Sequence, residues 1–203
     1  MTAQSGGGGR LATLPNALTV LRLLCVPILI ALLAAPSAEV ELTRNAAAVV
    51  FVLASITDIL DGRIARRRGQ VSAFGTLADP IADKALVGTA LVGLSLLGAL
   101  PWWVTAVIVI RELGVTVLRL WVLRQGIIPA SRGGKLKTVM QTIAITMYLM
   151  VLPPGMGGTD AGQAFDLLRM CVMGIAILLT VITGIDYVAR ALRLRRQAQA
   201  AAG

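Results

Sequence analysis

Long apolar runs, separated by short charged stretches, constrain this chain more than any other feature of its sequence. A bilayer core is crossed by about 20 consecutive apolar residues in a helix. Hydrophobic residues make up 57% of the 203 residues. We therefore expect an all-α integral membrane protein with six transmembrane helices. The six expected spans cover residues 16–35, 45–60, 80–100, 102–123, 136–152 and 165–192.

Basic residues alternate between the connections of these spans. The connections that follow the second and fourth spans and the C-terminal tail are rich in arginine and lysine, whereas the connections between them are poor in both. Basic loops stay in the cytosol. The sequence therefore predicts a multi-pass protein of a bacterial inner membrane, with both termini and the basic connections in the cytoplasm. These basic residues are Arg63, Arg66, Arg67, Arg68, Arg124, Arg132, Lys135, Lys137, Arg190, Arg193, Arg195 and Arg196.

We see no internal repeat, so a single six-helix membrane domain is expected at 13–192. A flexible, glycine-rich cytosolic tail is expected at 1–12 and a basic cytosolic tail at 193–203. The net charge of +9 in a soluble protein would suggest nucleic acid. Here the charge lies between apolar spans, so lipid headgroups and phosphates are the expected partners, and no nucleic acid is expected.

Four aspartates lie on either side of one expected connection. Asp58 and Asp61 are three residues apart and Asp79 and Asp83 are four apart, so each pair shares a helix face. Asp79 could cap the third span, with Pro80 at its first position. Each acid inside a membrane costs about 2.5–3.5 kcal/mol. A divalent cation would offset this cost, and since the chain has no histidine, oxygen ligands favour Mg²⁺, Mn²⁺ or Ca²⁺.

Small residues and an arginine accompany the aspartates. Gly62, Ala65 and Gly75 leave room for a bulky ligand, and Arg66 can bind a phosphate through two hydrogen bonds. Together with a metal they describe a pyrophosphate site. Each residue also has a structural explanation taken singly: Asp79 as a cap only, Gly62 as a helix end, and Arg66 as a topology signal.

The order Asp58-x2-Asp61-Gly62-x2-Ala65-Arg66-x8-Gly75-x3-Asp79-x3-Asp83 resembles the signature of the CDP-alcohol phosphotransferases at every fixed position. The resemblance implies a six-helix membrane fold, a homodimer and a polar cavity on the cytosolic side. It implies that Asp58, Asp61 and Asp79 bind a divalent metal, Mg²⁺ or Mn²⁺, with Asp83 as a further ligand and the catalytic general base. It implies that the CDP pocket is lined by Gly62, Ala65, Arg66 and Gly75.

Three further segments resemble the branch of this family that makes phosphatidylglycerophosphate from CDP-diacylglycerol and sn-glycerol 3-phosphate. They are Pro15-Asn16-x-Leu18-Thr19-x2-Arg22-x4-Pro27, Arg111-Glu112 followed by Arg119, and Gly134-Lys135-x-Lys137-Thr138-x2-Gln141. The acceptor phosphate is a dianion and needs cationic partners. We therefore expect it to be bound by Arg111, Arg119, Lys135 and Lys137.

Alternatives stay open for these cations and for the function. Arg111 could form an ion pair with a carboxylate such as Asp186, Lys135 and Lys137 could be topology signals only, and Arg22 could either snorkel or support the nucleotide pocket. A sister enzyme of the family would use inositol phosphate, serine or phosphatidylglycerol as acceptor. A cation transporter is the alternative from another class, but its acids would lie near the middle of the bilayer.

Overall fold

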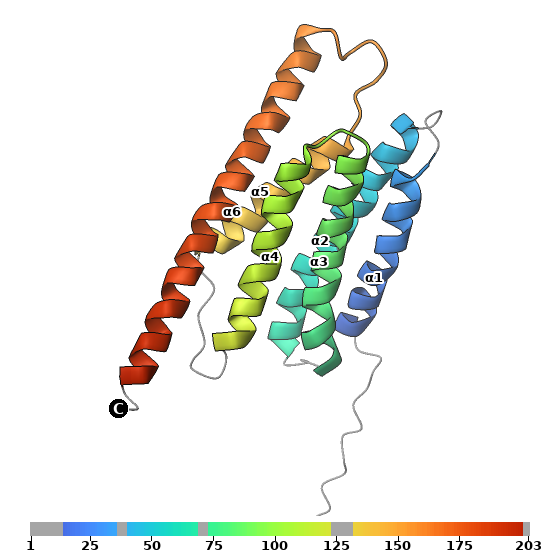
Figure 1. The fold of residues 1–203 in the computed structure, drawn as a ribbon. Helices are drawn as coiled ribbons and strands as arrows, with labels where there is room; N and C mark the ends of the chain where they lie inside the picture. Colours follow the sequence, from blue (N-terminus) through green and yellow to red (C-terminus); the bar gives the residue numbers. More distant parts are fainter. Residues whose placement is uncertain (1–13, 36–39, 69–72, 123–131, 201–203) are drawn as a thin grey trace, which may run out of the picture. The chain divides into compact units, whose positions relative to one another are not determined.

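Helix accounts for most of the chain that the structure describes. The structure, a computed structural model, describes residues 14–35, 40–68, 73–122 and 132–200, and the side chains within 19–35, 40–57, 81–118 and 133–195. The described residues form only helices and their connections, which confirms the all-α expectation (Figure 1). The helices are α1 (Leu14–Leu33), α2 (Val40–Arg68), α3 (Ala73–Leu96), α4 (Trp102–Val122), α5 (Arg132–Leu149) and α6 (Asp160–Ala200).

Length and composition alone identify fewer membrane-crossing segments than the sequence pattern predicts. Among the described residues, Val40–Thr57 and Asp160–Arg195 are long and apolar enough to cross a bilayer, and Thr19–Leu33 is a shorter apolar stretch. The described residues form the six expected helices. That all six cross the membrane stays a prediction.

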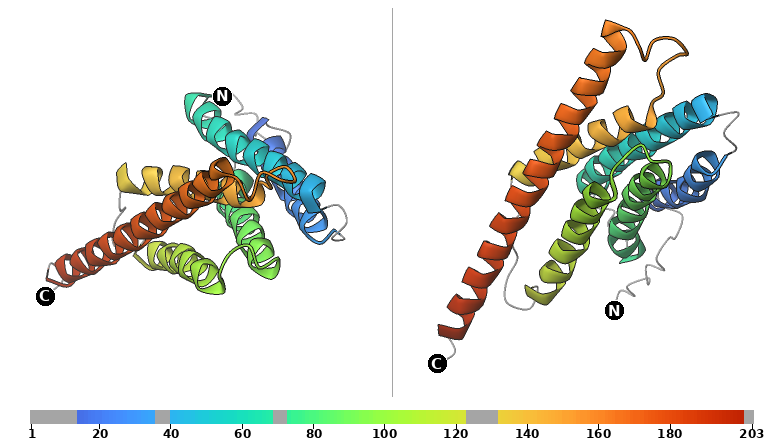
Figure 2. Two further views of the ribbon diagram at one scale, coloured as in Figure 1. Left: turned by 90° about the horizontal axis from the view of Figure 1, so that it is seen from above. Right: turned by 45° about the horizontal axis from the view of Figure 1, so that its top comes forward.

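The chain divides into two compact units, residues 1–90 and 91–203, and each is described by itself. In the first unit, α1 packs against α2 and the two helices run in opposite directions (Figures 1 and 2). In the part of α2 whose side chains are described, 40–57, the buried apolar side chains are Ala47, Ala48 and Ala54 and the larger Phe51. Small residues let helix backbones approach closely, which is how helices pack inside a membrane.

One expectation about helix ends in this unit is wrong, and one helix is longer than its expected span. The second span was expected to end at residue 60, and α2 continues beyond it to Arg68. Asp79 was expected to cap the third span with Pro80 at its start, but α3 already begins at Ala73, so both residues lie inside the helix. Alanine and arginine are strong helix formers, and arginine stems can cover apolar surface beyond a span. Helix formation therefore continues where the apolar run stops.

In the second unit, α6 packs against both α4 and α5. The ribbon shows α4 running in the same direction as α6, and α5 running in the opposite direction (Figures 1 and 2). The end of α3 joins this unit through a tight turn, in which Gly98 takes a φ of +68°. The amide of Ala99 donates to the carbonyl of Leu94 at 2.9 Å, as glycine-terminated helices commonly do. A buried hydrogen bond of 2.7 Å between Ser95 and Thr105 then joins α3 to α4.

The start of α6 is fixed by a cap. The Thr159 hydroxyl accepts a hydrogen bond from the Gly162 amide at 3.2 Å, which satisfies one of the free donors of the first turn. A Cβ at position 162 would lie 2.1 Å from the carbonyl oxygen of Met156, so only glycine fits there. The helix therefore begins at Asp160, earlier than the expected span, and it continues to Ala200, beyond the expected end at 192.

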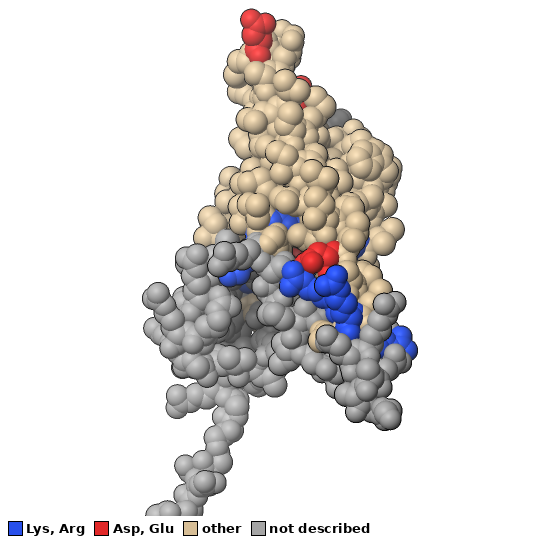
Figure 3. Space-filling view, turned by 90° about the vertical axis from the view of Figure 1, so that its left-hand side faces the viewer, with Lys and Arg blue, Asp and Glu red and all other residues tan. Residues whose placement is uncertain are grey.

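The surface of α6 is apolar along much of its length. Exposed side chains include Leu167, Leu168, Ile175, Leu178 and Ile182. Figure 3 shows a long tan stretch on the described part of this face, with acidic side chains at one end and a mixed group of basic and acidic side chains toward the other. Apolar patches of this size on a soluble protein mark sites of association. On a helix of this length, lipid is the natural neighbour.

Candidate functional site

The four aspartates lie on two helices of the first unit. Asp58 and Asp61 lie in α2, and Asp79 and Asp83 lie in α3, so the spacings of three and four residues do place each pair on one helical face. Asp83 is half-buried. The side chains of the other three, and those of the expected CDP-pocket residues Gly62, Ala65, Arg66 and Gly75, lie outside the part of the chain whose side chains are described.

The chemistry of the donor set suits a hard divalent cation. All four candidate ligands are carboxylates on helical backbone, and Mg²⁺ and Mn²⁺ prefer oxygen ligands. Within the described side chains, no group of three or more histidine, cysteine, aspartate or glutamate residues could hold a metal, but that set leaves out three of the four aspartates. The predicted metal site therefore stays a prediction.

Arg111 of α4 is held by α6 in the second unit. Its Nε donates to the carbonyl oxygen of Thr180 at 3.2 Å, and its Nη2 donates to the hydroxyl of Thr183 at 2.8 Å. Its Nη1 lies 3.4 Å from Oε1 of Glu112. The expected alternative, a pair between Arg111 and Asp186, is not found among the described contacts, because Asp186 pairs with Arg190 at 3.0 Å.

Glu112 also contacts the second expected acceptor cation. Lys137 of α5 is only 4% exposed, and its ammonium forms an ion pair and hydrogen bond with Oε1 of Glu112. One carboxylate therefore lies between a guanidinium on its own helix and an ammonium on another helix. A buried cation needs such a partner, because an uncompensated charge is costly to bury. We call Arg111, Glu112 and Lys137 the charged trio.

The other two expected acceptor cations differ from Lys137. Lys135 is exposed, although it lies only two residues away on α5. The side chain of Arg119 lies outside the described side chains. Burial within the charged trio argues against a pure topology signal for Lys137, since a topology signal needs only a position in the cytosol.

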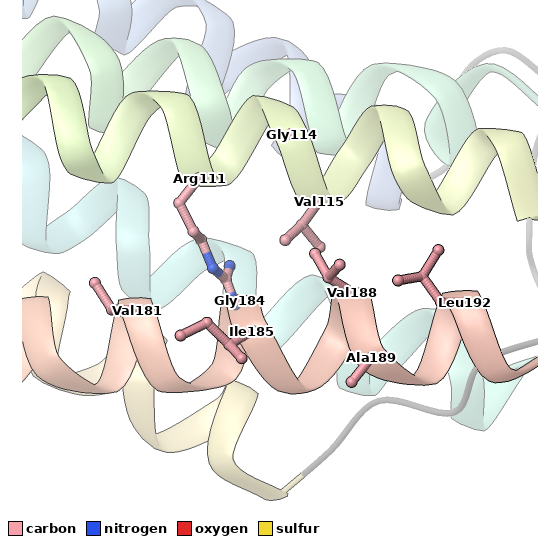
Figure 4. A pocket seen from close by; sticks show the side chains of 9 residues that line it. All are labelled: Arg111, Gly114, Val115, Val181, Gly184, Ile185, Val188, Ala189 and Leu192. Carbon is pink, nitrogen blue, oxygen red and sulfur yellow. The ribbon is translucent and has the colours of Figure 1, made fainter.

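Figure 4 shows how Arg111 reaches from α4 toward α6 beside Gly184. Arg111 borders a groove of about 510 Å³, and the other residues that line this groove are apolar. A Cβ at position 184 would lie 3.2 Å from Cγ of Arg111, so the glycine leaves the space that the arginine stem occupies. The lining residues are Arg111, Gly114, Val115, Val181, Gly184, Ile185, Val188, Ala189 and Leu192.

Sequence reasoning missed the α6 residues that contact Arg111. Thr180 is fully buried and Thr183 is 9% exposed. They are three residues apart, and Gly184 completes the same face. Small and hydroxyl-bearing residues inside an otherwise apolar run mark the side that faces other helices. That pattern could have predicted which face of α6 packs against another helix, but not that this face binds Arg111.

Two acids with no expected role have described surroundings. Asp166 pairs with Arg169 at 2.9 Å, and the guanidinium of Arg169 lies 5.1 Å from the ring centre of Tyr148 on α5. Asp160 lies in the first turn of α6, where a negative charge is favoured by the helix dipole. Asp160 thus favours the beginning of α6, and Asp166 pairs with the arginine that contacts α5.

Comparison with known proteins gives consistent matches along most of the chain. A family model described as CDP-alcohol phosphatidyltransferase matches residues 12–182. A protein of Mycobacterium tuberculosis strain H37Rv named “Probable phosphatidylglycerophosphate synthase” is 50% identical over 95% of this chain and 88% of its own length. Proteins named “CDP-diacylglycerol--glycerol-3-phosphate 3-phosphatidyltransferase” are 37% identical in Rickettsia typhi, over 86% of this chain and 94% of the relative, and 33% identical in Bacillus subtilis, over 86% and 92%.

Proposed function

The chain belongs to the CDP-alcohol phosphatidyltransferase family, and from this premise we propose that it transfers the phosphatidyl group of CDP-diacylglycerol to sn-glycerol 3-phosphate. The products are phosphatidylglycerophosphate and CMP, which places the enzyme in phospholipid biosynthesis. The observation that carries this proposal is the 50% identity, over 95% of the chain, to a protein named as a phosphatidylglycerophosphate synthase. The further relatives whose names specify the same donor and acceptor support it.

The nucleotide–lipid site of the proposal is built from α2 and α3. Asp58, Asp61, Asp79 and Asp83 would hold a divalent cation, in keeping with a family that is generally metal-dependent. When bound, the cation supplies positive charge to the diphosphate of CDP-diacylglycerol. The CDP moiety would be bound by Gly62, Ala65, Arg66 and Gly75.

The acceptor site of the proposal consists of the cations of α4 and α5. Arg111 keeps unused guanidinium hydrogens beyond its three described contacts, and these can donate to a phosphate. Glu112 pairs with both Arg111 and Lys137 and so holds the two cations near each other. Lys135 and Arg119 would add to the attraction of the dianion. Arginine suits such an anion because its planar guanidinium can donate two parallel hydrogen bonds, and lysine because it offers a compact cationic group with three donors.

The proposed reaction is an in-line substitution at the phosphorus that carries the diacylglycerol. Asp83 accepts the proton of the 1-hydroxyl of glycerol 3-phosphate, and the resulting oxygen forms the new ester bond. The bond from phosphorus to CMP breaks, and CMP leaves with the electron pair. General-base assistance of this kind typically contributes 10²–10⁴-fold to a rate.

The proposal also includes the arrangement of the protein in its membrane. All six helices would cross the bilayer, with both termini and the active site in the cytoplasm, as the alternation of basic residues indicates. The homodimer that the family resemblance implies is part of the proposal as well.

A panel of acceptors tests the activity directly. Purified protein in lipid nanodiscs receives CDP-diacylglycerol and one of glycerol 3-phosphate, inositol phosphate, serine or phosphatidylglycerol, and CMP release is measured. We expect rapid release with glycerol 3-phosphate only, its loss on addition of EDTA, and its return with excess Mg²⁺ or Mn²⁺. Release with another acceptor and none with glycerol 3-phosphate would contradict the proposal. Turnover that is unaffected by EDTA would contradict the metal site alone.

A further inference from the structure

Two buried polar groups of the second unit have no hydrogen-bond partner among the residues that the structure describes. They are Oε1 of Gln141 and Oγ1 of Thr180. Gln141 is 4% exposed and Thr180 is 0% exposed. Buried polar groups are nearly always satisfied in folded proteins, and each exception needs a physical explanation, of which a ligand is one.

Both groups belong to the surroundings of the charged trio. Gln141 lies four residues after Lys137 on α5, so the two side chains share one helical face, and Lys137 contacts Glu112 of α4. The carbonyl of Thr180 accepts the hydrogen bond from Nε of Arg111. Gln141 therefore shares a helical face with one member of the trio, and Thr180 itself bonds to another. The two residues come from the packed pair α5 and α6.

The chemistry of the pair suits a hydroxyl group rather than an ion. An amide oxygen accepts a hydrogen bond, and a threonine hydroxyl can both donate and accept. Neither group is charged. A ligand that carries a phosphate for Arg111 and Lys137, and a neutral hydroxyl on the carbon next to the one that bears the phosphate, would offer each of these groups a partner.

We propose that Gln141 and Thr180 bind the 2-hydroxyl of the acceptor, and thereby make the enzyme select a phosphorylated polyol over an acceptor that lacks this group. The inference rests on the proposed function. The 1-hydroxyl of glycerol 3-phosphate is the attacking group, so the 2-hydroxyl is the remaining hydroxyl that the protein can bind. Its O–H donates to Oε1 of Gln141, and its oxygen accepts from the hydroxyl of Thr180. A site built to bond a hydroxyl rejects the analogue without it strongly, because its own polar groups then stay unpaired.

The test compares two acceptors in wild-type protein and two variants. The acceptors are glycerol 3-phosphate and 3-hydroxypropyl phosphate, which keeps the phosphate and the attacking hydroxyl but lacks the 2-hydroxyl. The kcat/KM of CMP release is measured for each. We expect wild-type protein to prefer glycerol 3-phosphate by about ten- to hundredfold. Gln141→Met, which keeps the shape and removes the amide, should bring this ratio to within about threefold of one.

Thr180→Val is the second variant, because it removes only the hydroxyl and serves if Gln141→Met fails to fold. It should lower the same ratio by about tenfold. Thr146→Val is the matched control on α5, since the Thr146 hydroxyl donates to its own helix at the Thr142 carbonyl, 2.9 Å away. This control should keep the wild-type ratio.

A purely structural role, or a buried water between the two groups, would lower kcat/KM equally for both acceptors and leave the ratio unchanged. That result overturns the inference. A wild-type preference for glycerol 3-phosphate over 3-hydroxypropyl phosphate near one also overturns it, and this measurement needs no variant. If wild-type protein releases no CMP with glycerol 3-phosphate, the proposed function fails and the inference falls with it. If wild-type protein turns over and the variants keep its ratio, only the inference falls.

Discussion

Gly184 of α6 lies against the side chain of Arg111 of α4, so closely that a methyl group at position 184 would stand 3.2 Å from Cγ and 3.5 Å from Nε of the arginine. The same arginine donates to Thr180 and Thr183 one turn or less away on α6. The absence of a side chain at Gly184 therefore sets where the guanidinium can lie, and with it the proposed contact to the acceptor phosphate.

We predict that Gly184→Ala weakens acceptor binding without unfolding the protein. The new methyl must displace the arginine stem by a few tenths of an ångström, which loosens its bonds to α6. Overpacking costs about 1–3 kcal/mol, but alanine is favoured over glycine in a helix by about 1 kcal/mol, so the melting temperature should change little. The KM for glycerol 3-phosphate should rise about three- to tenfold, as CMP release at varied acceptor concentration will show.

Gly174→Ala is the control for this substitution. It lies in the same helix, and a Cβ there meets nothing within 4 Å. The gain in helix propensity is the same, but no arginine is displaced. Equal KM values in the two alanine variants would show that Gly184 does not position Arg111.

Glu112→Gln should destabilise the protein more than the loss of an exposed ion pair does. Lys137 is 4% exposed, and Glu112 is the carboxylate of its described ion pair. Removal of one partner from a buried pair costs about 3–5 kcal/mol, and the partial exposure of Glu112 places the expected loss near the lower end. Thermal unfolding in nanodiscs should show a clear fall in melting temperature, and the acceptor KM should rise because both cations of the trio lose their shared anion.

Asp166→Asn is the matched comparison for Glu112→Gln. Its pair with Arg169 has side-chain exposures of 45% and 28%, and such pairs contribute about 0–1 kcal/mol. Adding Lys137→Met to Glu112→Gln should recover part of the lost stability, since the ammonium that has lost its carboxylate is then absent as well. Equal melting temperatures for Glu112→Gln and Asp166→Asn would remove Glu112 from the role that its contacts indicate.

Helical periodicity was enough to predict that each aspartate pair shares one face of a helix, because residues three or four positions apart lie on the same face. The ends of the helices were not predictable from apolar runs. Arginine and alanine continue α2 to Arg68, and α3 begins at Ala73, six residues before the aspartate that was expected to cap it. Apolar runs indicate which part of a helix can lie within the bilayer, whereas the length of the helix also depends on helix propensity beyond the bilayer.

The pairing of charges was the least predictable part of the second unit. Sequence spacing allowed Arg111 to meet Asp186, but Asp186 bonds instead to Arg190, one turn away on its own helix. The partner of Lys137 is Glu112, which is 25 residues away in the chain. Such contacts depend on how helices pack against each other, and no local pattern encodes that.

Asp83→Asn should abolish turnover while the protein stays folded. The amide cannot accept the proton of the attacking hydroxyl, so kcat should fall by about 10²–10⁴-fold. Asp160→Asn, in the first turn of α6, should keep normal activity. CMP release and the melting temperature are measured for both variants. Full activity of Asp83→Asn would exclude Asp83 as the general base.

A titration with metal separates the two proposed roles of Asp83. If the residue serves only as a ligand, excess Mg²⁺ or Mn²⁺ should restore the rate of Asp83→Asn, because a weakened site fills at higher concentration. If it is the base, the rate stays low at saturating metal. We expect the second result.

The proposed orientation predicts which ends of the helices are open to reagents outside the cell. Gly157 lies in the connection between α5 and α6 and has nothing within 4 Å of a built Cβ, so a cysteine fits there without strain. Arg193 is exposed near the end of α6 and belongs to the basic group expected in the cytoplasm. In a background with Cys25 and Cys171 replaced by alanine, a membrane-impermeant maleimide applied to intact cells should label Gly157→Cys and not Arg193→Cys. Labelling of Arg193→Cys should require permeabilised cells, and the reverse pattern would place the proposed active site on the wrong side of the membrane for its nucleotide substrate.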